Sequence, residues 1–132
     1  MIIKYDNLDD FFIQKAKSLP KTREDTKAYI ASTFVKYKNT DTDLSKKSLT
    51  IEFSQAKSNW SFSQFQNIAD WILWAESTFP TALNDASKEY YHTLGQLCYY
   101  KCYIMTKRSW IVFEEIADNL PNIVTYFQSK NI

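Results

Sequence analysis

The sequence predicts an all-α fold, a single-domain bundle of five or six helices over residues 1–132. Apolar residues recur at helical spacing along most of the chain, and 45% of the residues are hydrophobic, which is enough for one core at this length. The only glycine in the sequence is Gly95. Because hairpin turns and phosphate-binding loops depend on glycine, its scarcity disfavours sheets and loop-built nucleotide sites.

The N-terminal part of the chain contains two predicted helices and a polar connection. Apolar residues within 8–19 follow the i, i+3, i+4 pattern, and Pro20 ends this first helix. Thr22 opens a second helix with the spacing of a capping box, and the helical pattern runs to about Lys38. Residues 39–47 are polar and unpatterned, which predicts an exposed loop.

The middle of the chain contains an ambiguous segment followed by a clear helix. In residues 49–53, three apolar residues alternate with polar ones, which suits either a short extended segment or the start of a helix. Ser61 has capping-box spacing with Gln64, and the apolar face that follows predicts a long helix over 61–79, which Pro80 ends.

The C-terminal part of the chain predicts a broad helix over 81–107 and a further helix after it. The width of the apolar stripe predicts that helix 81–107 is central and buried on most sides. The stripe consists of Leu83, Ala86, Tyr90, Leu94, Leu97 and Ile104, flanked by Tyr91, Cys98 and Cys102. Lys101 interrupts the stripe, and we expect it to snorkel or to pair with Glu114 or Glu115. Pro121 either kinks the last helix or opens a sixth.

Composition bounds the function. Sixteen basic and fifteen acidic side chains give a net charge of +1, so neither nucleic acid nor a membrane is an expected partner. One histidine and two cysteines are too few for a zinc site, so we expect no metal and no cofactor. Cys98 and Cys102 lie four apart on a predicted helix and are expected to be reduced core thiols. The lack of a signal-peptide pattern and of a long apolar run predicts a cytoplasmic protein.

Two groups of side chains are candidates for binding. Lys88, His92, Tyr99 and Tyr103 share one face of the helix over 81–107, and this face suits a patch that bonds a partner. The alternative is a solvated histidine with tyrosine hydroxyls that bond neighbouring helices.

The second group is a pair of tryptophans, Trp71 and Trp74, which are displaced from the apolar stripe of helix 61–79. Exposed tryptophans are typical anchors of protein interfaces. In a bundle this rich in aromatic residues, packing inside the core is the competing interpretation.

These observations favour a non-catalytic, cytoplasmic protein-binding module, because catalytic residue types are scarce while Tyr and Trp are abundant. A small inhibitor fits the size and composition, such as an immunity protein that neutralises a partner like a bacterial toxin. One alternative is a small helical hydrolase or nuclease that uses His92 with Glu89 or a tyrosine. Another is a nucleic-acid-binding accessory protein that uses the lysine-rich first half of the chain.

Overall fold

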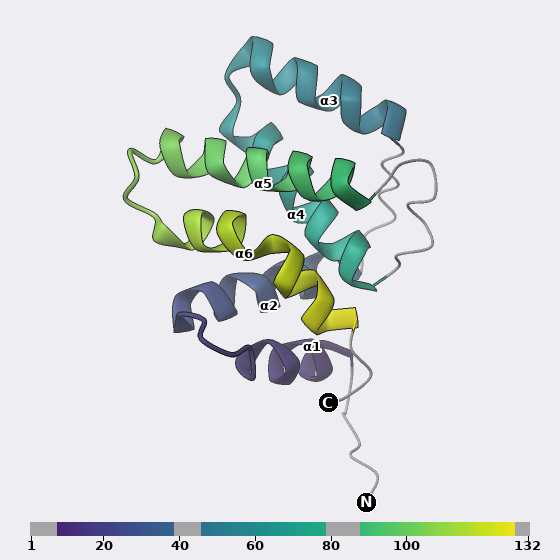
Figure 1. The fold of residues 1–132 in the computed structure, drawn as a ribbon, viewed down its shortest axis with the longest axis vertical. Coiled ribbons are helices and arrows are strands. Elements are labelled where there is room, and N and C mark those ends of the chain that lie inside the picture. The colour runs from purple at the N-terminus through teal and green to yellow at the C-terminus, as the bar shows by residue number, and fades with distance from the viewer. Residues whose placement is uncertain (1–7, 39–45, 79–87, 129–132) are drawn as a thin grey trace, which may run out of the picture.

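One helix of this fold is enclosed by the others. The computed structural model describes residues 8–38, 46–78 and 88–128, which form six helices and, within these ranges, no strand. The helices are α1 (Leu8–Lys17), α2 (Glu24–Lys38), α3 (Lys46–Asn59), α4 (Phe62–Thr78), α5 (Lys88–Met105) and α6 (Ile111–Gln128) (Figure 1). The all-α prediction is confirmed. Within the same ranges, every helix falls short of the combination of length and apolar composition that a membrane span requires.

The enclosed helix is α4, where every residue from Ile68 to Ser77 is buried. It packs against α2, α3, α5 and α6, and the buried apolar side chains of the bundle form one connected core. In Figure 1, α5 lies on the viewer's side of α4, with α3 and α6 on either side of it. The structure thus places α4, which the sequence marked only as a long helix, at the centre.

The prediction that helix 81–107 is the central one is wrong. α5 packs mainly against α4 and α6 and buries only one face. That face consists of Tyr91, Leu94, Gly95, Cys98, Tyr99 and Cys102. Leu97 and Ile104, which belong to the predicted stripe, are exposed. Apolar residues surround most of this helix, so their spacing did not show which side meets the core. The predicted portion over 81–87, with Leu83 and Ala86, lies outside the described residues.

Residues 49–53 are helical, not extended, and belong to α3. Leu49 and Ala56 are fully buried, and the Phe53 ring lies 6.1 Å from the ring of Phe65 on α4. This i, i+4, i+7 spacing places one side of α3 against α4, while Ile51 points to solvent. Of the predicted loop over 39–47, residues 39–45 lie outside the described residues and the last two begin α3.

α6 continues through Pro121 as one helix. A proline lacks the N–H that would bond the carbonyl four residues earlier, which here is the carbonyl of Ala117. The side chain of Gln96 on α5 donates to this carbonyl at 2.9 Å. The bond from Gln96 replaces the missing helical bond and also ties α5 to α6.

Two helix ends and one turn between helices hold side chains where glycine is usual. Lys21, Trp60, Lys107 and Arg108 have φ values of 52°, 48°, 56° and 59°. At the end of α3, the N–H of Ser61 donates to the carbonyl of residue 56, and the end of α5 repeats this pattern from Arg108 to residue 103. These are Schellman caps, in which the left-handed residue is usually glycine. A residue with a Cβ costs about 1–2 kcal/mol in this conformation.

The single glycine has a different role. Gly95 lies inside α5, where a Cβ would come within 2.7 Å of Leu120 Cδ2 and 3.2 Å of Ile72 Cγ2. Gly95 therefore allows α5 to approach both α4 and α6 closely. This contact requires the side of α5 that carries Gly95 to face the core.

We expect Gly95→Ala to lower the free energy of unfolding by about 1 kcal/mol. The added methyl group must displace the side chain of Leu120, which is fully buried, and such overpacking costs about 1–3 kcal/mol. This exceeds the gain of about 1 kcal/mol in helix propensity. Urea denaturation measures the effect, with Thr93→Ala on the exposed side of α5 as the control. A Gly95→Ala variant as stable as the wild type would contradict the proposed close approach.

Candidate functional site

Trp71 and Trp74 are both buried in the core. The ring of Trp74 lies 5.6 Å from the rings of Phe12 on α1 and Phe34 on α2, in edge-to-face geometry. Core packing is therefore the role that the structure assigns to these tryptophans, and they are not available as anchors on the surface.

Tyr99 is also buried, and it belongs to a polar network around Asp70 on α4. The hydroxyl of Tyr99 donates to Asp70 Oδ1 at 2.7 Å, and the hydroxyl of Tyr29 on α2 lies 2.8 and 2.9 Å from the two carboxylate oxygens. Gln66 in turn donates to the Tyr29 hydroxyl at 2.9 Å. Burial raises the pKa of Asp70 to about 6, while the two tyrosine hydrogen bonds act in the opposite direction. The network ties α2, α4 and α5 together.

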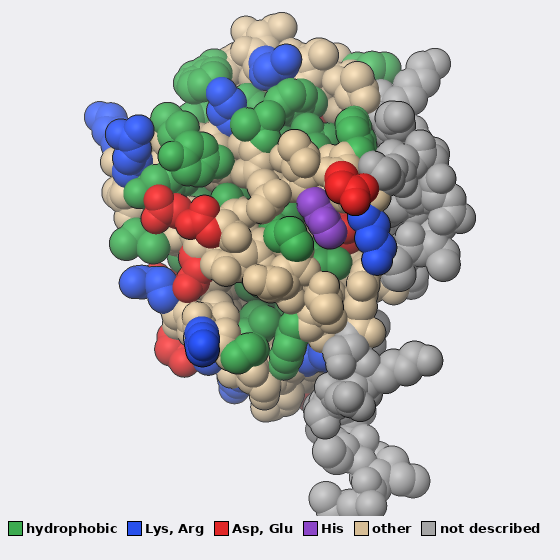
Figure 2. Space-filling model, in the orientation of Figure 1, with side chains coloured by type: hydrophobic (Ala, Val, Ile, Leu, Met, Phe, Trp, Pro, Cys, Tyr) green, Lys and Arg blue, Asp and Glu red, His purple; other side chains and the backbone are tan. Residues whose placement is uncertain are grey.

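His92 meets a buried carboxylate that sequence reasoning missed. Its Nε2 lies 2.7 Å from Oε2 of Glu76 on α4, which is only 3% exposed. Burial raises the pKa of Glu76 to about 7 and lowers the pKa of His92, and the nearby Lys88 lowers both. Each burial effect disfavours charge at neutral pH, so the contact is weaker than a full ion pair. Figure 2 shows the single histidine at the surface between acidic and basic side chains.

The predicted face of Lys88, His92, Tyr99 and Tyr103 therefore does not form one site. Tyr99 faces the core, His92 faces α4, and Tyr103 lies beside Glu114 at the start of α6. Lys88 is exposed at the first turn of α5. These residues mostly contact the helices that α5 packs against. The tyrosine hydroxyls bond neighbouring helices, as the alternative interpretation expects.

A different side of α5 carries apolar groups into solvent. Leu97, Tyr100 and Ile104 follow i, i+3, i+7 spacing and are 39%, 42% and 36% exposed. The ammonium of Lys101, on the same side, lies 5.1 Å from the ring of Trp60, which is 53% exposed at the end of α3. Lys101 thus contacts Trp60 and not Glu114 or Glu115. We call Trp60, Leu97, Tyr100, Lys101 and Ile104 the α5 face.

Basic side chains lie within the α5 face and beside it. From Tyr90 to Val112 the sequence contains Lys101, Lys107 and Arg108 and no acidic residue, and from 53 to 69 it contains Lys57 and no acidic residue. Figure 2 shows hydrophobic side chains gathered over α3 and α5, with basic side chains at the edge of that area. This side of the bundle thus carries apolar groups and these cations, and acidic side chains also lie on it, with Glu89 and Glu114 at its borders.

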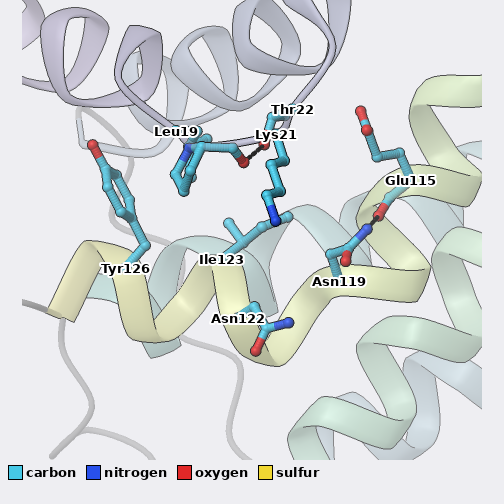
Figure 3. Close-up of a pocket in the computed structure, with 9 residues that line it drawn as sticks. Leu19, Lys21, Thr22, Glu115, Asn119, Asn122, Ile123 and Tyr126 are labelled. Atoms are coloured by element: carbon cyan, nitrogen blue, oxygen red, sulfur yellow. Dashed lines mark hydrogen bonds between the residues drawn. The ribbon is translucent and has the colours of Figure 1, made fainter.

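A pocket of about 390 Å³ lies elsewhere, between the turn that follows α1 and one side of α6. Its walls combine apolar side chains with a cation, a carboxylate and two amides. They consist of Leu19, Pro20, Lys21, Thr22, Glu115, Asn119, Asn122, Ile123 and Tyr126 (Figure 3). The Tyr126 hydroxyl donates to the carbonyl of Lys15 at 2.6 Å, which fixes one wall. The pocket contains neither His92 nor any residue of the α5 face.

Cys98 and Cys102 are free and buried, as the sequence predicts. Burial raises the pKa of Cys98 to about 12 and also raises the pKa of Cys102, so neither is a reactive thiolate at neutral pH. Within the part of the chain that the structure describes, no three His, Cys, Asp or Glu side chains are grouped so as to hold a metal ion.

No protein-family model, curated protein or solved structure matches this chain. Its function has to be inferred from its own residues.

We expect Tyr99→Phe to lower the free energy of unfolding by about 1–3 kcal/mol at pH 7.5, because it removes a hydrogen bond from the buried Asp70 carboxylate. The loss should be smaller at pH 5, where a carboxyl group with a pKa of about 6 is mostly protonated. Tyr100→Phe is the control on the exposed side and should change stability by less than about 0.5 kcal/mol. Equal effects of the two substitutions in chemical denaturation would rule out the network's role.

We expect the free energy of unfolding of Glu76→Gln to increase relative to that of the wild type as pH rises from 5 to 7.5. The pKa of Glu76 is about 7 in the fold and ordinarily 4.5. Between these values the folded state holds the proton more tightly than the unfolded chain, so the stability that Glu76 contributes at low pH is lost as pH rises. The lowered pKa of His92 acts oppositely, since it removes stability as pH falls, but His92 is present in both proteins.

The measurement is denaturation of Glu76→Gln and the wild type at several pH values, with Glu89→Gln on the exposed side of α5 as the control. A stability difference for Glu76→Gln that does not vary with pH would show that Glu76 titrates normally.

Proposed function

We propose that this chain is a non-catalytic protein-binding module that engages its partner through the α5 face. The observation that carries the proposal is the exposure of Trp60 and Tyr100 beside Leu97 and Ile104 on one side of the bundle. Tryptophan and tyrosine are the residues most enriched among energetic anchors of interfaces. A partner that covers these groups would remove apolar surface from water, which is favourable by about 25 cal/mol per Å².

Backbone strain beside this face supports the proposal. Trp60, Lys107 and Arg108 all hold left-handed backbone conformations, and all three are exposed. Glycine at these positions would relieve the strain. The Trp60 ring packs edge-to-face on the buried ring of Phe65 at 6.0 Å, while Lys107 and Arg108 are exposed. Strain that is retained at exposed side chains is typical of functional surfaces.

The rigidity of α5 also suits recognition. The Gly95 contact, the Asp70 network and the bond from Gln96 to α6 fix the inner side of α5, so its outer side is held in one conformation before binding. A preformed surface loses less conformational freedom on association than a flexible one.

Within this class we favour a small inhibitor, such as an immunity-type protein that neutralises a toxin. This step is an analogy from size and composition. A reducing compartment such as the cytoplasm suits the two free, buried thiols.

A hydrolase or nuclease that acts through His92 is the second candidate function. The 2.7 Å approach of His92 Nε2 to Glu76 favours it, because a carboxylate that hydrogen-bonds an imidazole can orient it for proton transfer, but the geometry here does not form that hydrogen bond. Such an enzyme also needs space for a substrate beside the ring, and the pocket of Figure 3 is not lined by His92.

We expect Trp60→Ala and Tyr100→Ala each to weaken partner binding by about 30-fold or more, as truncation of an interface anchor usually does. The tagged wild-type protein serves as bait in lysate of the native host. Proteins captured by the wild type but lost with both variants are identified by mass spectrometry, purified, and titrated by calorimetry.

Ile51→Ala is the matched control, because Ile51 is exposed to a similar degree on α3 but lies outside the α5 face. Circular dichroism and thermal melts verify that each variant folds. If folded Trp60→Ala and Tyr100→Ala variants bind every captured protein as Ile51→Ala does, the α5 face is not the binding surface.

A further inference from the structure

The charges around the α5 face are segregated from those of the rest of the chain. The whole sequence has sixteen basic and fifteen acidic side chains, yet the segments 53–69 and 90–112 together contain four basic residues and no acidic one. These four are Lys57, Lys101, Lys107 and Arg108. Acidic residues border this group, with Glu89 exposed at the start of α5 and Glu114 beside Tyr103, so the excess of positive charge is confined to the surface between them.

Two of these cations lie against aromatic rings. The ammonium of Lys101 is 5.1 Å from the Trp60 ring, and that of Lys57 is 4.9 Å from the Phe53 ring. Each ring holds its ammonium beside apolar surface, where a carboxylate of a partner would meet cation and ring together.

We infer that the partner presents an acidic protein surface around an apolar centre, and that the cations in and beside the α5 face steer it onto this face. This inference rests on the proposed function and adds the chemistry of the partner. The apolar side chains of the α5 face supply the buried centre of the interface, while Lys57, Lys101, Lys107 and Arg108 supply its charged rim.

A second copy of this chain fits the α5 face less well than such a partner. A symmetric dimer through this face would bring the same cations of both copies together. Repulsion among these groups disfavours self-association.

A nucleic acid also fits less well, although it shares the negative charge. Leu97 and Ile104 are aliphatic and offer no surface on which bases stack, and Lys101 already lies over the Trp60 ring, which leaves Tyr100 as the one ring of the α5 face on which a base could stack. These side chains favour a protein, and nucleic acid binding remains an outcome that the experiment detects.

The first probe is a fluorescein-labelled amphipathic helical peptide of about 18 residues, with leucine and tryptophan along one side and glutamate on the others. The comparison probes are the same peptide with lysine in place of glutamate, and a single-stranded thymidine oligonucleotide. We expect the glutamate peptide to bind at least about tenfold more tightly than the lysine peptide at low salt, and to weaken as salt rises. Equal binding of the two peptides, or tighter binding of the oligonucleotide, would overturn the inference.

The second part uses Lys107→Gly, which removes a cation and also relieves the left-handed backbone at residue 107. We expect this variant to be at least as stable as the wild type in urea, and to associate several-fold more slowly with the glutamate peptide and with any protein identified by capture. Lys101→Gln should act in the same direction. Lys17→Gln, at an exposed lysine of α1, is the control with the same loss of charge.

The two proposals fail in different ways. If Trp60→Ala and Tyr100→Ala abolish capture while Lys107→Gly and Lys101→Gln associate at the wild-type rate at every salt concentration, the acidic-partner inference is wrong and the proposed function stands. If the aromatic variants retain capture, the proposed function itself is wrong.

Discussion

The arrangement of this bundle depends on one buried carboxylate, Asp70 on α4. A carboxylate inside a protein is costly unless hydrogen-bond donors surround it, and here the donors are the hydroxyls of Tyr29 from α2 and Tyr99 from α5. Each donor is effective only at hydrogen-bond distance, so the network fixes where α2 and α5 lie against α4. Because α5 is apolar on several sides, its orientation depends on this network together with the close approach of Gly95 to Leu120 and Ile72. The hydroxyl of Tyr99 and the Gly95 contact both place the same side of α5 inward, which leaves Leu97 and Ile104 exposed.

Because glycine is scarce, backbone strain falls at helix ends that lack a glycine. The only glycine is used inside α5, at its close approach to Leu120 and Ile72, and not at a helix end. The ends of α3 and α5 keep their Schellman hydrogen bonds with Trp60 and Lys107 in the left-handed position. This has a cost in backbone strain, and it also changes the surface. Glycine would present no side chain at these turns, whereas Trp60 presents an indole and Lys107 a cation.

The sequence predicted the helices well but not how they face one another. Spacing and capping residues located α1, α2, α4 and α6 because these signals are local. The orientation of α5 and the environment of Trp71 depend on which helices pack nearby, and the partner of Asp70 on α2 is 41 residues away along the chain. A signal for the carboxylate sites was nevertheless present, since Asp70 interrupts an apolar run and such a residue needs a buried partner. The α5 face was missed because its apolar residues resembled core positions.

The two buried carboxylates of α4 differ in how many hydrogen-bond donors they receive. Asp70 pairs with Tyr99 and Glu76 with His92, so α4 and α5 run antiparallel and Asp70 lies nearer the end that carries Trp60. Asp70 receives tyrosine donors from two helices, whereas Glu76 Oε1 has no hydrogen-bond partner among the described residues. Unsatisfied buried groups lower local stability, so the half of α5 beyond Leu97 is the firmer half. A binding surface that is formed in advance belongs on that half, which is where the exposed aromatic and basic side chains lie.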